Sequence, residues 1–510
     1  MIRYTASNQL SLELFKHPFE HALDQDNRWI KLAALIPWDS LANIYAKSLN
    51  SDSGRLSVDI RMVIGALIIK HKMTLSDRDT VALISENVYM QYFCGLKNFQ
   101  SKQPFDASLF VDIRKRLGNE KFDAFNGEII RKYQEIEQGK KGKQQKQHQD
   151  RHNSERSKQT NTDTDKPNKG TLKIDASVAD QYITYPTDLK LLNTCRQESE
   201  RLIDALYLKG HFSEKPRTYR RKARTEYLDL SKKRNKDTRL IHKSIGKQLR
   251  FLRRNIASVN TMLDKFEGTR FPLPKRDQKI FWVMQHLFNQ QQEMHIQRKH
   301  TCENRIVNLY QPYVRPILRG KDKAKVEFGA KINISEVDGM VRLDHFSWEN
   351  FNEGIDVELQ LERYCGLYGC YPELLLADRI YLTRENRRIL KEKQIRIVGK
   401  PLGRPPREEL NAYQKRKLKK ERNQRNHVEA KFGQAKNGYR LNQIRTKRSD
   451  TSKSWISAIL FIMNLEKLYK AAEKQVAFIF YFVLNVIRRY SDRMNQQNIS
   501  HDLIFKYSCA

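Results

Sequence analysis

Cysteine is scarce in this chain of 510 residues, which has six spread from Cys94 to Cys509. Only Cys365 and Cys370 lie close together, and no second pair of cysteines and no paired histidines complete a zinc site. This content argues against a disulfide scaffold. It is typical of reduced thiols in a cytoplasmic protein.

Apolar stretches of the kind that direct a chain to a membrane are also missing. The first 19 residues contain no apolar core as long as that of a signal peptide. Near the end, residues 476–487 (VAFIFYFVLNVI) are strongly apolar, but 12 residues are too few to span a bilayer. We therefore expect a cytoplasmic protein without membrane contact, and we treat 476–510 as an apolar tail of unknown role.

Acidic residues are too few to balance the basic ones. The chain has 95 Lys and Arg against 59 Asp and Glu, a formal net charge of +36. Residues 213–255 contain 16 basic and 4 acidic residues, and residues 401–450 contain 15 and 5. Such an excess usually indicates a polyanionic partner, most often nucleic acid.

The first part of the chain, residues 1–135, has a helical pattern. The nearly continuous apolar run 57–70 predicts a buried helix, Ser76 is a plausible N-cap of the next helix, and Asp106 could cap a third. Three short helices suit a helix-turn-helix DNA-binding module and a generic helical bundle about equally well. Residues 136–170 are polar and of low complexity, which predicts a disordered linker.

From Thr171 onward the pattern is that of an α/β domain. TLKIDASVA alternates apolar and polar residues with the period of a strand. A basic, mainly helical stretch follows over about 188–315, and strand and helix patterns then alternate. These later elements are expected at 326–335, 340–348, 356–368, 372–378, 384–392, 394–398 and 408–436. The order predicts, over 171–475, a mixed sheet that carries a large helical insertion after its first strand.

Two aspartates follow apolar strand patterns. Asp175 is expected at the end of the strand that begins at Thr171, and Asp378 directly follows the apolar run 374–377. Folds of the α/β class form their ligand crevice at the carboxyl ends of strands. Aspartate is also common there because it suits turns, so neither residue is diagnostic alone.

The predicted helix over 408–436 supplies a third carboxylate, Glu429. An apolar stripe at i, i+4, i+7 and i+11 would pack on the sheet, and its members are Val428, Phe432, Ala435 and Tyr439. Arg425, Glu429 and Lys436 form a second stripe beside it. An ordinary Arg–Glu pair on a solvated helix is the alternative interpretation.

Two aspartates and a glutamate make an oxygen-only ligand set, which favours Mg²⁺ or Mn²⁺ over zinc. Two such ions about 4 Å apart can activate the attacking oxygen and stabilise the leaving oxygen of an in-line phosphoryl displacement. We therefore expect Asp175, Asp378 and Glu429 to be catalytic metal ligands. Arg425 and Lys436 are expected to contact DNA phosphates.

On these residues the chain resembles the DDE transposases of bacterial insertion sequences that have an InsH-like N-terminal domain. The blocks that carry the resemblance are KIDASVADQYITYPTDLKLLN, VRPILRGKDKAKVEFGAKI, LLADRIYLTRENR and RNHVEAKFGQAKNGYRLNQIRTK. The last block matches the family's pattern of Arg, three residues, Glu, six residues and Lys at Arg425, Glu429 and Lys436. The family often has Tyr three residues before that Arg, where this chain has Arg422.

The resemblance implies an RNase H-like fold for 171–475 and Mg²⁺-dependent cleavage of double-stranded DNA at terminal inverted repeats. It implies that the freed 3′-OH ends are then joined to target DNA, with Arg422 near the bound DNA ends. A bacterial, nucleoid-associated protein is expected. We also expect a homo-oligomer, because two ends must be joined.

Two other functions are compatible with these patterns. An RNase H-like nuclease or resolvase would cut without joining, although the extra helical domain and the basic insertion argue against it. A catalytically silent DNA-binding derivative would be expected to have lost one of the three acids, and all three are present.

Overall fold

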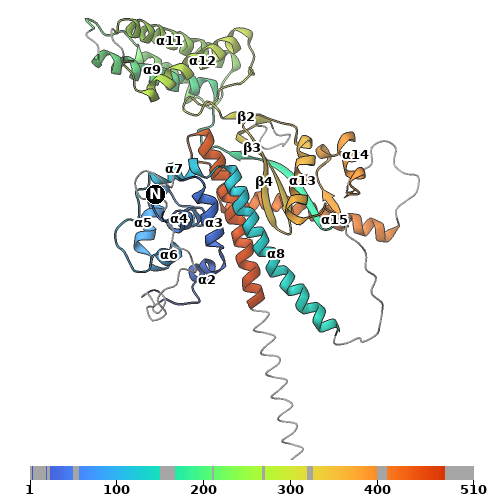
Figure 1. Cartoon of the computed structure of the whole chain (residues 1–510). Coiled ribbons are helices and arrows are strands. Elements are labelled where there is room, and N and C mark those ends of the chain that lie inside the picture. Colours follow the sequence, from blue (N-terminus) through green and yellow to red (C-terminus); the bar gives the residue numbers. More distant parts are fainter. Residues whose placement is uncertain are drawn as a thin grey trace, which may run out of the picture.

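The structure is a computed structural model that describes residues 3, 19, 23–49, 57–149, 167–209, 212–266, 270–318, 326–398 and 411–476. Within 57–149, side chains are described up to residue 138. A helical N-terminal domain, a domain built on one sheet and a separate helical lobe make up the molecule (Figure 1). None of the helices in these ranges is both long and apolar enough to cross a membrane. Most of the predicted tail, from 477 on, lies outside the described residues.

The N-terminal domain is helical, as predicted. Its described helices are α2 (Arg28–Leu35), α3 (Trp38–Ala46), α4 (Ile60–Lys72), α5 (Asp77–Glu86), α6 (Val88–Phe93), α7 (Leu109–Arg116) and α8 (Asn119–Gln149). Helix α4 is buried along most of its length, and the Ser76 hydroxyl caps α5 by accepting from the Asp79 N–H. Asp106 accepts from the Ser108 N–H in the turn before α7, so it shapes that turn although the helix begins three residues later.

Helix α8 differs from the predicted linker. It continues to Gln149, so the first part of the 136–170 segment is helical, and residues 150–166 lie outside the described ones. Lys and Gln are good helix formers, and a helix needs no apolar stripe to extend beyond the domain that anchors its first turns. Low apolar content therefore excluded a core here without excluding a helix.

The sheet is mixed and has six strands, β1 (Thr171–Asp180), β2 (Arg315–Leu318), β3 (Val326–Val337), β4 (Met340–Ser347), β5 (Leu374–Leu376) and β6 (Arg396–Ile397). β1 pairs antiparallel with β3 on one side and parallel with β5 on the other, and β5 pairs parallel with β6. On its far side β3 pairs antiparallel with β2 over residues 326–329 and with β4 over 331–337. The predicted mixed sheet is confirmed, and β2 is an additional strand.

Helices cover both faces of this sheet. α13 (Val357–Tyr368) and α14 (Arg384–Glu392) share a core cluster with Leu172, Ile174 and Leu375 on one face. On the other face, α15 (Ala412–Gly438) and a helix over 449–476 share a cluster with Ala179, Ile332 and Ile334. The predicted helices α13, α14 and α15 are confirmed with small changes at their ends.

The helix over 449–476 was not among the expected elements, and it joins two domains. Its Ile459 and Met463 pack in the sheet cluster, whereas Phe461 contacts the rings of Phe122 and Phe125 on α8. Figure 1 shows it, in red, alongside α8. The N-terminal domain is therefore anchored to the sheet through a shared apolar interface.

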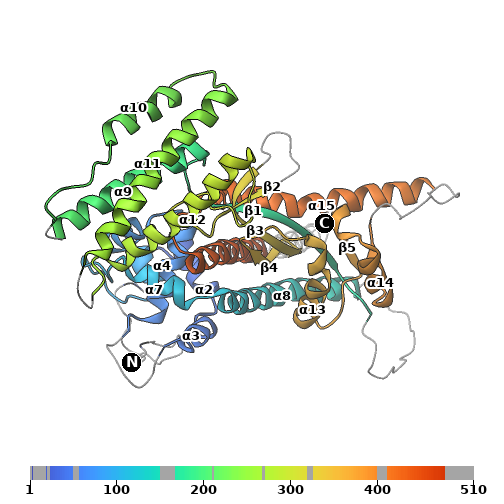
Figure 2. The same cartoon turned by 90° about the horizontal axis from the view of Figure 1, so that it is seen from above.

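The predicted insertion between the first and second core strands is helical and forms its own lobe. It contains α9 (Asp188–Lys209), α10 (Arg220–Ser231), α11 (Thr238–Asp264) and α12 (Lys275–Gln297). α9, α11 and α12 pack around a separate cluster that includes Leu202, Leu252 and Met284. The lobe extends to one side of the sheet in Figure 2. The path of the chain therefore leaves β1, builds a second core, and returns at β2.

Candidate active site

The register of the parallel pair brings the two aspartates to the same level. Thr171 is opposite Leu374 and Lys173 is opposite Leu376. Two residues further along both segments, Asp378 falls level with Asp175, and the backbone at Asp378 is still extended (φ −75°, ψ 165°). The carboxyl end of β5 therefore delivers Asp378 beside β1.

Asp175 lies in the middle of β1, and its predicted place at a strand end is wrong. β1 continues to Asp180 because β3 pairs with it along its whole second half, after β5 has ended. β5 therefore pairs with β1 only over residues 171–173, and Ile444 forms a parallel bridge with Gln181 directly after the end of β1.

Both aspartates also share a face of the sheet. Leu374 and Leu376 pack with Leu418 of α15, and strand alternation continues that side to Asp378. On β1, Ala179 packs in the α15 cluster, and residues an even number of positions away, including Asp175, point to the same side. Asp175 and Asp378 are therefore both on the face that α15 covers.

Glu429 reaches this face from α15, which contacts both β1 and β5. Val428 and Phe432 are buried against the sheet, as the apolar stripe predicted, and Glu429 lies at their border with its side chain 50% exposed. Its Oε1 lies 2.7 Å from Arg425 Nη2. The Arg–Glu pair of the alternative interpretation is thus present, and it stands next to the two aspartates.

The surroundings of Asp175 disfavour its negative charge. Burial, more than any other cause, raises the pKa of this carboxyl to about 6. Hydrogen bonding from the Ala176 backbone and the charge of Arg425 lower the pKa, whereas the negative charges of Glu353 and Glu429 raise it. Near neutral pH the site therefore concentrates negative charge that a bound cation would relieve.

Two of the predicted DNA-binding arginines lie beside Asp378. A cavity of about 340 Å³ is lined by Leu376, Ala377, Asp378, Arg379, Leu382, Val398, Arg422 and Arg425. Arg425 therefore takes part both in this cavity and in the charge environment of Asp175. Guanidinium groups around an exposed carboxylate suit a phosphate held next to a metal-binding acid.

Asn386 on α14 holds the loops on either side of the site. Its buried side-chain amide donates to the Gly354 carbonyl at 2.7 Å and to the Tyr381 carbonyl at 2.8 Å. The two acceptors lie in two short 3₁₀ helices, η1 (Glu353–Asp356) and η2 (Arg379–Tyr381). η1 begins with Glu353, and η2 directly follows Asp378. One side chain therefore links the segments that position two acids.

Glu353 was not predicted as a site residue. It lies in η1, 17% exposed, 3.0 Å from the Lys331 ammonium group, and its charge acts on Asp175. The surrounding sequence, SWENFNEGID, has neither helical nor strand spacing, so no pattern indicated this acid. The pairing of β3 with β4 and the loop that follows bring it to the site.

Lys436 lies two turns further along α15, away from the acids discussed above. Its ammonium group is 3.7 Å from a carboxylate oxygen of Asp180 and 3.7 Å from one of Glu327. In this position it holds α15 to β1 and β3. Its predicted contact with DNA phosphates stays a prediction.

The predicted metal ligands have suitable chemistry, but they do not form a closed set. Within the described ranges, no three or more His, Cys, Asp and Glu side chains are grouped so that they could hold a metal ion. Their carboxylate oxygens, and the like charges around Asp175, fit a hard divalent cation. One oxygen of Glu429 already pairs with Arg425 at 2.7 Å.

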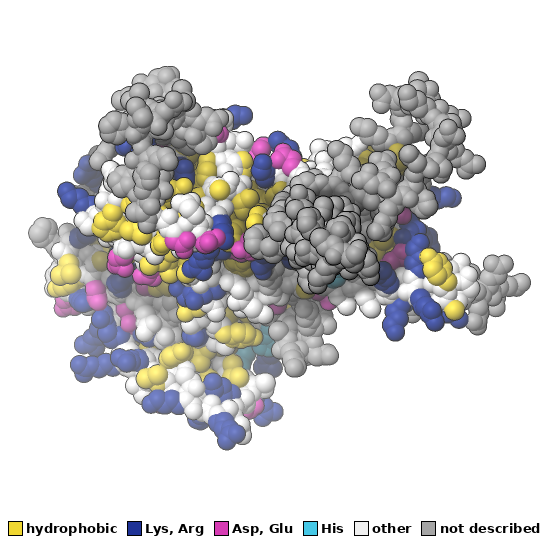
Figure 3. Space-filling view, turned by 90° about the horizontal axis from the view of Figure 1, so that it is seen from below, with side chains coloured by type: hydrophobic (Ala, Val, Ile, Leu, Met, Phe, Trp, Pro, Cys, Tyr) yellow, Lys and Arg dark blue, Asp and Glu magenta, His cyan; other side chains and the backbone are white. Residues whose placement is uncertain are grey.

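Basic side chains extend from the site along the first half of α15. The exposed cations of these turns are Lys415, Arg416, Lys417, Lys419, Lys420 and Arg422. Figure 3 shows Lys and Arg side chains, in dark blue, spread over the face in view. This distribution agrees with the prediction of a polyanionic partner.

Comparison with known proteins matches the chain in two separate parts. A family model described as a transposase domain (DUF772) matches residues 17–116, and one described as a transposase DDE domain matches residues 375–466. The second match includes Asp378 and Glu429, and Asp175 lies outside it. No solved structure matches the chain.

A curated relative, described as uncharacterized protein ORF8 in the nfe locus of Rhizobium meliloti, is 32% identical over 106 residues. The aligned part covers 21% of this chain and 51% of that protein. The chain therefore spans about half the length of this relative. The two family matches nevertheless confirm the predicted resemblance to insertion-sequence DDE transposases.

Proposed function

We propose that the protein is a DNA transposase that cuts the ends of its element and joins the 3′-OH ends to target DNA. The proposed catalytic core is RNase H-like. The strand order β4-β3-β1-β5-β6, with β3 alone antiparallel to its neighbours, supports this assignment. The large helical lobe is then an insertion after β1.

The observation that carries the proposal is the shared position of Asp175 and Asp378. They fall level on adjacent parallel strands and on the face covered by α15, which carries Glu429 at the border of its buried stripe. Three acids from two strand segments and one helix, set among cations, suit phosphodiester chemistry on DNA. An isolated surface Arg–Glu pair would not require this convergence.

In the proposed reaction, Asp175, Asp378 and Glu429 would hold divalent cations, Mg²⁺ or Mn²⁺. When bound, these ions would activate the attacking oxygen and stabilise the leaving oxygen of an in-line displacement. Arg422 and Arg425 line the cavity beside Asp378 and would hold the phosphates that flank the scissile bond. Asp175 must be ionised to act as a ligand, so activity should rise through pH 6.

The direct test replaces Asp378 by Asn and measures Mg²⁺-dependent cleavage of a duplex that carries the element end. We expect cleavage to be lost while DNA binding is retained, because the substitution removes a ligand charge and keeps the shape of the exposed side chain. Glu392→Gln, an exposed acid at the end of α14 and outside both the site and the basic lobe, is the control. Cleavage by Asp378→Asn at the normal rate would refute the catalytic assignment.

Pre-cut ends separate transposition from its alternatives. A transposase should join a pre-cut 3′-OH end to a second duplex in the presence of Mg²⁺. Cutting without joining would support the nuclease or resolvase, and binding without either reaction would support the catalytically silent derivative. We also propose that the N-terminal helices and the basic lobe bind the ends, and that the protein acts as a homo-oligomer because two ends must meet.

A further inference from the structure

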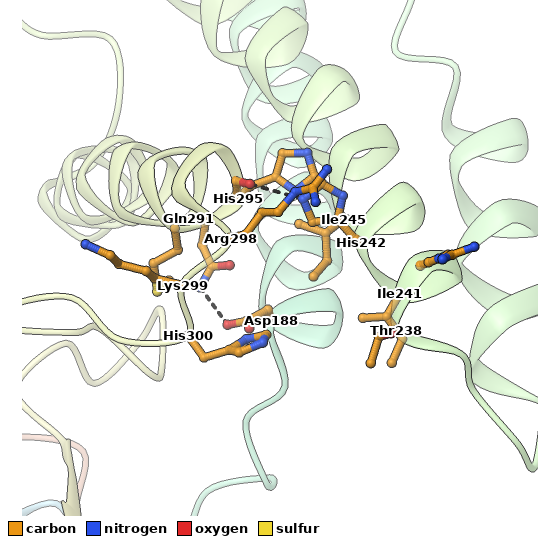
Figure 4. Close-up of a pocket in the computed structure, with 12 residues that line it drawn as sticks. Asp188, Thr238, Ile241, His242, Ile245, Gln291, His295, Arg298, Lys299 and His300 are labelled. Carbon is orange, nitrogen blue, oxygen red and sulfur yellow. Dashed lines mark hydrogen bonds between the residues drawn. The ribbon is translucent and has the colours of Figure 1, made fainter.

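The helical lobe contains a cavity that the proposed chemistry does not use. It has a volume of about 490 Å³ and lies where the start of α9, the first turns of α11 and the last turn of α12 meet (Figure 4). That volume is in the range of small-molecule sites. Its lining combines one flat aromatic pair, an apolar wall and a rim of cations.

The aromatic pair is formed by His242 and His295. Their rings stack with centroids 3.9 Å apart and planes inclined by 21°, and the His242 ring nitrogen Nε2 lies 3.1 Å from the His295 carbonyl oxygen. Burial lowers the pKa of His295, which favours a neutral ring. Ile241, Ile245 and Met294 complete the apolar wall.

Gly246 makes this arrangement possible. A Cβ on this residue would lie 2.9 Å from Nε2 of His295, closer than side-chain carbons ordinarily approach. Glycine within a helix such as α11 costs about 1 kcal/mol relative to alanine in intrinsic propensity. The position is therefore explained by the close approach of the His295 ring.

The rim is cationic and is not neutralised. Arg239, Arg298 and Lys299 are exposed, and none of the described acidic side chains forms an ion pair with them. Asp188 is the only acid in the lining, and it already accepts from Arg305 at 2.7 Å and from Gln291 at 2.9 Å. The rim of the cavity can therefore bind a negatively charged group.

Arg298 occupies a backbone position that usually selects glycine. It follows α12 with φ +53° and ψ 33°, in the left-handed region that a non-glycine side chain adopts at a cost. The arginine is nevertheless present at the mouth of the cavity, which suggests that its side chain is used. A planar apolar surface beside unpaired cations matches a ligand with a flat ring and a phosphate.

We propose that this cavity binds one nucleotide, with its base against the His242–His295 pair and its phosphate on Arg239, Arg298 and Lys299. Stacking on aromatic rings with phosphate contacts is how unpaired nucleic acid strands are held. The inference rests on the proposed function, in that a transposase handles DNA with exposed ends. The same nucleotide chemistry could come from a free nucleotide, and the test separates the two sources.

The test measures binding of the full-length protein to a short single-stranded oligonucleotide containing 2-aminopurine, to a duplex of the same length, and to free deoxyadenosine monophosphate. The double variant Arg239→Ala/Lys299→Ala should weaken single-strand binding at least tenfold. The slope of log affinity against log salt should fall by about 0.7, because the cavity holds one phosphate and each phosphate contact contributes about 0.7 for single strands. If the double variant also loses affinity for free deoxyadenosine monophosphate, the ligand of the cavity would be a free nucleotide.

Lys275→Ala/Arg276→Ala is the matched control, since it removes two exposed cations from the other end of α12. It should change single-strand affinity less than threefold. The proposal would be overturned if the two double variants lost single-strand affinity equally. It would also be overturned if the cavity variant lost affinity for duplex and single strand equally, because the effect would then be one of general basic charge.

Gly246→Ala tests the base contact without changing charge. It favours the helix but displaces the His295 ring, so the quenching of 2-aminopurine on binding should be reduced while thermal stability of the lobe is retained. Unchanged quenching in this variant would refute the stacking role of the histidine pair. Asp378→Asn should leave this binding intact, so failure here and failure of the proposed catalysis are distinguishable.

Discussion

Replacing Asp175 by Asn should stabilise the protein while abolishing its reaction. Asp175 is partly buried, and its ionised form is disfavoured by burial and by the charges of Glu353 and Glu429. Asparagine keeps the shape and can still accept from the Ala176 backbone, but it carries no charge. The variant should therefore remove an electrostatic penalty that the folded protein carries near neutral pH.

The magnitude follows from the pKa of Asp175, which rises from 3.8 in the unfolded reference to about 6 in the folded protein. A folded-state pKa above the unfolded value gives stability at low pH that is lost as the pH rises through the folded value. At 1.36 kcal/mol per pKa unit, the full penalty above pH 7 is about 3 kcal/mol. At pH 5, where most folded molecules are protonated at Asp175, about half of it remains.

The assay is urea denaturation of the wild type and of Asp175→Asn at pH 7.5 and pH 5, with and without Mg²⁺. The variant should gain up to about 3 kcal/mol at pH 7.5 and about half as much at pH 5. Mg²⁺ should stabilise the wild type more than the variant, because binding to the folded state alone adds stability.

Asp378→Asn is the matched control. It removes the same charge from an exposed carboxylate and keeps a good helix-capping residue, so stability should change by less than about 0.5 kcal/mol. If Asp175→Asn is no more stable than the wild type at pH 7.5, the electrostatic description of the site is wrong. A gain that is the same at both pH values would also contradict it.

Three further substitutions test how the site is held. Asn386→Ala should destabilise the protein by about 1–3 kcal/mol, because two carbonyl acceptors lose their donor, and hydrogen exchange should rise in η1 and η2. Arg396→Ala should lower the free energy of unfolding by about 2 kcal/mol, because the buried Glu421 loses its bidentate partner. Protease should then cleave the start of α15 faster, and an unchanged rate would contradict a role for this ion pair in holding the helix. Asp123→Ala removes the carboxylate that Arg342 contacts at 2.8–3.0 Å, so the free energy of unfolding of the N-terminal domain should fall by about 2 kcal/mol. In calorimetry, the N-terminal and sheet domains should then unfold in two transitions where the wild type shows one.

Local patterns identified most of the elements of the sheet domain. The period of two at Thr171, the apolar run before Asp378 and the stripe of Val428 and Phe432 predicted β1, β5 and α15, because alternation and helical spacing depend only on neighbouring residues. The same kind of reading missed the helix over 449–476. Its residues are apolar on two sides, since it packs on the sheet and on α8 at once, and such a helix has no single stripe.

Composition and the pattern of single elements were enough to predict the charge, the three candidate acids and the helical spacing of Glu429 with Arg425. That Asp378 is level with Asp175 could not be predicted in this way, because strand register depends on pairing between distant segments. The same holds for the action of Glu353 on Asp175 and for the pairing of Lys436 with Asp180 and Glu327. Electrostatic interactions are set by distance and burial in space, and neither is a function of separation along the chain.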